Sequence, residues 1–102
     1  MNETALMLAI HDEFARSGRL WIHRNQTGKI GRIRFGLGVG GADLVGLLRG
    51  SGRGFACEVK TPVGRMSPEQ KCWKTGWEAA GGVYVVAHSV DEAMAELERA
   101  AG

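Results

Sequence analysis

Residues 42–60 read ADLVGLLRGSGRGFACEVK, and this stretch predicts two strands joined by a tight turn. The apolar runs at 42–48 and 55–60 have the length of ordinary strands, and the segment 49–54 between them is rich in glycine. A turn of this kind returns the chain antiparallel to itself. The stretch therefore predicts a β-hairpin.

Helices and further strands are predicted on either side of this hairpin. Leu6, Ile10 and Phe14 recur at helical spacing, while Ser67 and Ser89 each open a capping box. The expected elements are a helix at 3–16, a strand at 20–23, a helix at 68–80, a strand at 83–87 and a helix at 90–100. The order α-β-β-β-α-β-α predicts an α/β fold, with a mixed sheet flanked by helices.

Residues 26–41 are basic and rich in glycine, and they predict a long loop with a short extended piece at 30–35. A loop of this length in a compact domain is uncommon unless it contacts a ligand. Residues 36–41 contain the pattern G-x-G-x-x-G, but a dinucleotide site needs a strand before it and a helix after it, and here a strand follows. The glycines instead favour a turn before Asp43 or a close approach of backbone to phosphate.

Length and composition predict one cytoplasmic domain over residues 1–102. Apolar residues make up 44% of the chain and charged residues 24%, which is ordinary globular usage. The apolar runs are far shorter than the roughly 20 residues that span a bilayer. The N-terminus lacks the basic region and cleavage site of a signal peptide. We therefore expect no contact with a membrane.

The net charge of +2 is unevenly distributed. Residues 1–66 carry ten Lys/Arg and five Asp/Glu, whereas residues 67–102 carry three and six. The arginine-rich first part is compatible with a face that binds nucleic acid. Charge alone does not distinguish such a face from an ordinary solvated surface.

Glu58 and Lys60 lie two residues apart on a strand and therefore share one face of the sheet. Taken alone, this pair also fits an ion pair or a solvated sheet face. Asp43 favours a metal site, because the hairpin places it roughly opposite residues 58–60. Two converging carboxylates suit Mg²⁺ or Mn²⁺, and a neighbouring lysine can orient water or neutralise charge on a phosphate. These three residues predict phosphodiester hydrolysis.

The motifs around these residues closely resemble the VRR-NUC domain, a branch of the PD-(D/E)XK restriction-endonuclease-like nucleases. They are GGADLVG at 40–46 and EVKTPxGRxSPEQ at 58–70. The resemblance covers nearly the whole chain, since RNxTG at 24–28 and GGxY at 81–84 also match. The chain resembles a stand-alone domain of phage or bacterial type.

The resemblance implies a restriction-endonuclease-like core and a Mg²⁺- or Mn²⁺-dependent endonuclease that cleaves DNA. It implies structured substrates such as junctions or flaps, and a homodimer like that of the Holliday-junction resolvases. The implied site residues are Asp43 and Glu58 as metal ligands, Lys60 as the catalytic lysine, Gln70 as an accessory residue and Glu3 beside the metal. Met7 departs from the family, where relatives often have glutamine.

The expected nucleic-acid contacts are basic or polar residues near the site and in the loop: Arg24, Asn25, Lys29, Arg32, Arg34 and Arg65. One alternative is a non-catalytic nucleic-acid-binding module on the same fold. A weaker one is a phage anti-host or structural protein. The presence of all three central residues favours the nuclease.

Two further residue types are expected to serve packing. The three tryptophans, Trp21, Trp73 and Trp77, predict core or interface positions, and the last two lie one helical turn apart. The two cysteines, Cys57 and Cys72, have neither disulfide nor zinc spacing and are interpreted as small packing residues.

Overall fold

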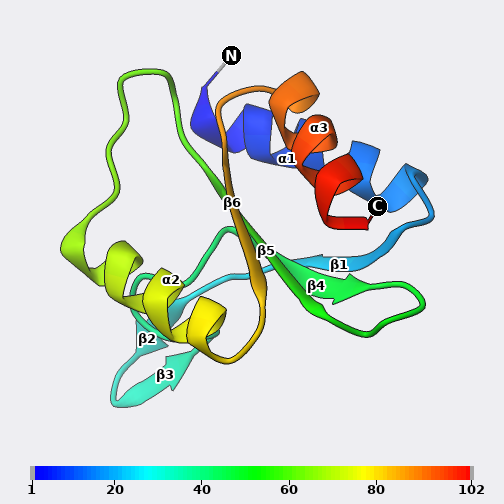
Figure 1. The fold of residues 1–102 in the computed structure, drawn as a ribbon. Coiled ribbons are helices and arrows are strands. Elements are labelled where there is room, and N and C mark those ends of the chain that lie inside the picture. The colour runs from blue at the N-terminus through cyan, green and yellow to red at the C-terminus, as the bar shows by residue number, and fades with distance from the viewer. Residues whose placement is uncertain (1, 102) are drawn as a thin grey trace.

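The computed structural model describes residues 2–101 as a mixed sheet flanked by helices, which confirms the predicted α/β class (Figure 1). In chain order the elements are α1 (Glu3–Arg16), β1 (Leu20–Arg24), β2 (Gly28–Ile30), β3 (Ile33–Phe35), β4 (Leu44–Leu48), β5 (Gly54–Val59), α2 (Pro68–Ala79), β6 (Val83–Ala87) and α3 (Val90–Ala101). No helix within residues 2–101 is long and apolar enough to cross a membrane.

The main sheet has four strands in the order β1-β4-β5-β6. The predicted hairpin joins β4 to β5, with Leu44 opposite Cys57 and Leu47 opposite Gly54. Strand β6 pairs with β5 in parallel, so α2 is the crossover helix between them. Because alternate residues of a strand face opposite sides, this register decides which side chains meet on each face.

Helices α1 and α3 pack together on one face of the sheet, and α2 lies on the other (Figure 1). The α1/α3 face holds the larger core, in which the rings of Phe14 and Phe55 meet edge to face at 5.5 Å. The smaller core under α2 consists of Ala42, Ala56 and Tyr84, with partly buried side chains around them. The two helical layers therefore cover the sheet unequally.

The loop expected at residues 26–41 contains a second, two-stranded sheet, which differs from the single extended piece predicted there. Strands β2 and β3 pair antiparallel, with Lys29 opposite Arg34 and Ile30 opposite Ile33. Gly31, at φ 59°, allows the tight turn between them. Most of this hairpin is exposed, because it pairs only with itself.

The segment between the small hairpin and β4 is fixed against the start of α2. The indole nitrogen of Trp73 donates to the carbonyl of Leu37 at 2.8 Å. Gly40 has φ 83° and lies so close to the backbone of Glu69 and Gln70 that any side chain there would collide. These contacts hold the chain that leads into Asp43.

Candidate functional site

Asp43 lies at the start of β4, on the face that α2 covers. Its backbone carbonyl accepts a hydrogen bond from the amide of Asn25 at 2.8 Å. Continuing the β4–β5 register by one residue places it opposite Glu58, as predicted. Its side-chain Oδ2 accepts from the amide of Val59 at 2.8 Å, which fixes the carboxylate at the end of β5.

Among residues 2–101, Glu58 is the only charged residue that is buried, with 2% of its surface exposed. Its Oε1 accepts a hydrogen bond from Nε2 of Gln70 at 3.0 Å and lies 3.6 Å from Nζ of Lys60. Its Oε2 is buried and has no hydrogen-bond partner in the part of the chain that the structure describes. A buried polar atom without a partner is costly, so this oxygen calls for a ligand.

Lys60 follows Glu58 by two residues, which brings both side chains to the same face. The amide of Lys60 donates to the carbonyl of Ala87 at 3.0 Å and extends the parallel pairing with β6. Its side chain is largely buried. The ammonium is therefore held beside the carboxylate of Glu58 rather than free in solvent.

Gln70 connects the start of α2 to the carboxylates. It forms the predicted capping box, since its Oε1 accepts from the amide of Ser67 at 2.8 Å and its own amide donates to Ser67 Oγ at 3.1 Å. The remaining side-chain nitrogen donates to Glu58. The helix cap and the orientation of Glu58 thus depend on one side chain.

The electrostatics of Glu58 favour a bound cation. Burial, together with the nearby carboxylate of Asp43, raises the pKa of Glu58 to about 8, against the opposing effect of the Lys60 ammonium. Two carboxylates at close range oppose each other's ionisation unless positive charge lies between them. A divalent cation bound between the two carboxylates would supply that charge.

The donor set fits a hard divalent cation held by two carboxylates. Asp43 and Glu58 offer oxygen ligands, including the unpartnered Oε2, and Mg²⁺ is commonly held by one or two carboxylates together with waters and substrate phosphate. Within residues 2–101, no group of three His, Cys, Asp or Glu side chains converges on one point. Glu3 lies exposed in the first turn of α1 and does not complete such a group.

Tyr84 belongs to the same face, and the sequence interpretation did not single it out as a site residue. It lies opposite Ala56 on β6, and its hydroxyl is buried without a hydrogen-bond partner among the described residues. Burial, followed by the charges of Glu58 and Asp43, raises the pKa of this hydroxyl. The available signal was a tyrosine within an apolar strand, because a buried phenol usually has a polar partner.

Five of the six expected nucleic-acid contacts are exposed. Exposed positions are Lys29 and Arg34 on the small hairpin, Arg32 in its turn, Arg24 at the end of β1 and Arg65 before α2. Asn25 has a structural role, because its side chain donates to the carbonyl of Ala42 at 3.0 Å and accepts from the amide of Leu37 at 3.1 Å. Its amide therefore ties the loop to the start of β4.

The tryptophans and cysteines divide into packed and exposed members. Trp73 and Trp77 stack with ring centroids 5.0 Å apart, which confirms their packing role. Trp21 is 57% exposed and therefore lies outside the core, whereas the interface position that was the other alternative for it stays a prediction. Cys57 is buried as predicted, whereas Cys72 is exposed on α2 and its predicted packing role is wrong.

Comparison with known proteins adds no assignment to this arrangement. No protein-family model matches the chain, and no curated protein does either. A function is therefore inferred from the side chains around Glu58 and from the sequence motifs that contain them.

Proposed function

We propose that this protein is a metal-dependent endonuclease that hydrolyses DNA phosphodiester bonds, with Mg²⁺ or Mn²⁺ held by Asp43 and Glu58. The observation that carries this proposal is the buried, unpartnered Oε2 of Glu58. It lies next to a second carboxylate and beside the ammonium of Lys60, 3.6 Å from Oε1. Two acids and a lysine are groups that can hold a divalent ion and stabilise the negative charge that develops during phosphodiester hydrolysis.

Each side chain has a distinct part in this mechanism. Asp43 and Glu58 would hold the divalent ion, which would supply activated water and polarise the scissile phosphate. The amide of Val59 and the side chain of Gln70 fix the orientation of these two carboxylates. Lys60 orients the attacking water and stabilises the negative charge that develops on the phosphate.

The exposed basic residues of the small hairpin support a polyanionic substrate. Register places Lys29 directly opposite Arg34, and like charges in this position destabilise a hairpin unless an anion lies between or beside them. A DNA backbone supplies such anions. Branched DNA, implied by the resemblance to VRR-NUC domains, is the proposed substrate.

We further propose that the protein acts in the cytoplasm as a homodimer. The small hairpin exposes three apolar side chains, Ile30, Ile33 and Phe35. An isolated two-stranded hairpin is only marginally stable, and an exposed apolar patch marks an interaction surface. A second copy covering these residues accounts for their exposure. Analytical ultracentrifugation of the wild type and of Ile33→Asp distinguishes a dimer from a monomer.

Cleavage assays test the enzymatic proposal directly. Labelled junction, flap and linear duplex DNA are incubated with Mn²⁺, with Mg²⁺ or with EDTA. We expect cleavage only with metal, and a loss of about 10²- to 10³-fold or more in Asp43→Asn, Glu58→Gln and Lys60→Ala. Glu78→Gln, which changes an exposed acid on α2, serves as the matched control and should cleave like the wild type.

A non-catalytic DNA-binding module is the second candidate. The observation that favours it is the convergence of only two acids at this site within residues 2–101. Tight binding of branched DNA with no metal-stimulated product in any buffer would select this module and reject the nuclease.

A further inference from the structure

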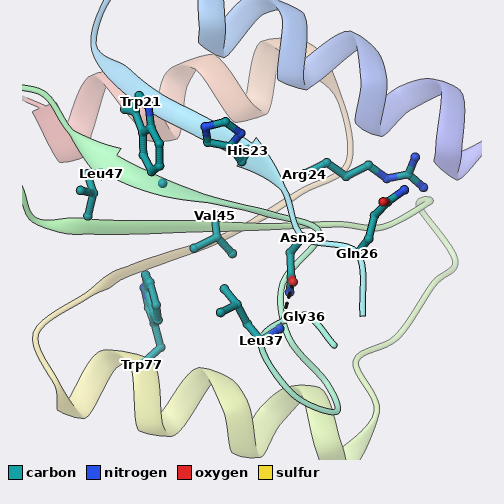
Figure 2. A pocket seen from close by; sticks show the side chains of 11 residues that line it. Trp21, His23, Arg24, Asn25, Gln26, Gly36, Leu37, Val45, Leu47 and Trp77 are labelled. Carbon is teal, nitrogen blue, oxygen red and sulfur yellow. Dashed lines mark hydrogen bonds between the residues drawn. The ribbon is translucent and has the colours of Figure 1, made fainter. Parts of the chain in front are cut away.

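The face of the sheet that carries Asp43 continues beyond the candidate site and is left open there. On this face β1 and β4 align Trp21 with Leu47 and His23 with Val45. Trp21 is 57% exposed and Leu47 is 44% exposed. A groove of about 530 Å³ lies between these strands and α2 (Figure 2).

The walls of the groove are mostly apolar and aromatic. On the sheet side of the groove, the ring centroids of Trp21 and His23 lie 4.3 Å apart. Trp77 forms the facing wall on α2, across the groove from Trp21 (Figure 2). Its indole nitrogen donates to the carbonyl of Val83 at 2.8 Å, so this wall has a fixed orientation. Two aromatic walls with a space of this size suit a flat, apolar ligand.

The groove is charged and polar at one end only. Figure 2 shows Arg24 and Gln26 at the end away from Trp21 and Leu47. Its lining residues, all within the described part of the chain, include no Asp or Glu. The polar end leads to the candidate metal site, because the amide of Asn25 donates to the carbonyl of Asp43. The groove therefore complements an anionic ligand with an apolar ring.

We infer that this groove binds an unpaired nucleobase of the strand whose phosphodiester lies at Asp43 and Glu58. The inference rests on the proposed nuclease function and deepens it by naming the substrate feature. Val45 and Leu47 lie about 7 and 14 Å along β4 from Asp43, which is within reach of a nucleotide one or two positions from that phosphodiester. A base stacks on Trp21 in the groove, and its adjoining phosphate lies at the polar end, whose rim is lined by Arg24 and Gln26.

This arrangement selects substrates with an unpaired nucleotide next to the cut. A base inside a duplex is stacked on both faces and cannot enter the groove. A base in a flap, a gap or a single strand enters without the cost of unpairing. The groove thereby favours single-stranded or branched DNA over a continuous duplex.

The first test measures binding in EDTA, so that cleavage is not required. The probe is a short, labelled oligothymidylate. We expect Trp21→Ala to weaken its binding by about tenfold or more, which is the range for the loss of one base–aromatic stack. Leu8→Ala truncates an exposed apolar residue on the opposite side of the sheet and should bind like the wild type. Equal binding by wild type and Trp21→Ala, or no binding by the wild type, overturns the inference.

An abasic scan locates the base. A single abasic nucleotide is moved along the same oligonucleotide, and affinity is measured for the wild type and for Trp21→Ala. We expect one position at which the wild type loses about tenfold in affinity and Trp21→Ala loses nothing further. Equal losses in both proteins at every position overturn the inference.

A second variant protects the test against misfolding. Val45→Phe fills the groove while leaving Trp21 in place, and we expect it to weaken oligothymidylate binding by a similar factor. A dimer that dissociates on Trp21→Ala without loss of oligonucleotide affinity shows that a second copy occupies the groove, and overturns the inference. If Trp21→Ala cleaves DNA and binds the oligonucleotide like the wild type, the proposed role of the groove is rejected and the nuclease proposal stands. If Trp21→Ala weakens oligonucleotide binding but the wild type never cleaves, only the nuclease proposal is rejected.

Discussion

The sheet face beneath α1 and α3 is closed by apolar side chains, whereas the face beneath α2 carries the charges and remains partly open. Phe14 and Phe55 are buried in the first face, and Glu58 and Trp21 lie on the second. Strand alternation sends neighbouring residues of one strand to these opposite faces. Within each strand, the residues that stabilise the core and the candidate site residues therefore lie on opposite faces. A single substitution can change one set without changing the other.

Two leucines of β4 test this separation with the largest expected effect. Leu44 is fully buried on the closed face, and Leu47 is 44% exposed on the open face. We expect Leu44→Ala to lower the free energy of unfolding by about 2–5 kcal/mol, through lost apolar contact and a cavity. Leu47→Ala should lower it by less than about 1 kcal/mol. Urea unfolding measures both, and equal losses would show that the faces do not differ in their contribution to stability.

Glu58→Gln is expected to raise the free energy of unfolding, by less than Leu44→Ala lowers it. The raised pKa means that the folded protein holds a proton on Glu58 between pH 4.5 and about 8, where the unfolded chain has released it. In the metal-free protein this group therefore lowers stability progressively as the pH rises through that window. We expect Glu58→Gln to stabilise the metal-free protein by about 1–3 kcal/mol at alkaline pH and by little at acidic pH.

Urea unfolding in EDTA at about pH 5 and about pH 9 measures this difference. Glu78→Gln, which removes an exposed acid on α2, is the matched control for removal of one acid. A variant that is destabilised at alkaline pH would show that charged Glu58 is already neutralised by its protein neighbours. The electrostatic part of the metal proposal would then fail.

Tyr84→Phe should have the smallest effect on stability. The hydroxyl is buried without a protein partner, so its removal should change the free energy of unfolding by less than about 1 kcal/mol or raise it slightly. Thermal unfolding in EDTA checks this value. A loss well above 1 kcal/mol would show that a hydrogen bond to this hydroxyl exists in solution.

The features that the sequence predicted well depend on local rules. Asp43, Glu58 and Lys60 follow from strand alternation and from one short hairpin, and the capping role of Gln70 follows from a four-residue motif. These rules act over a few residues and need no knowledge of distant packing. The predicted fold class depended on the same rules.

The features that the sequence did not predict depend on which helix covers which part of the sheet. The exposure of Trp21 follows from the limited reach of α2, which no local pattern in β1 reveals. The pairing of β2 with β3 was hidden because both strands are only three residues long.

The dual contact of Gln70 has a consequence for the dynamics of the protein. The first turn of a helix opens more readily than its middle, and such local opening occurs without global unfolding. When this turn opens, the side chain that closes the cap also releases Oε1 of Glu58. Fraying of a single helical turn is thus sufficient to disorganise the carboxylate, and whatever braces Gln70 also keeps the acid aligned.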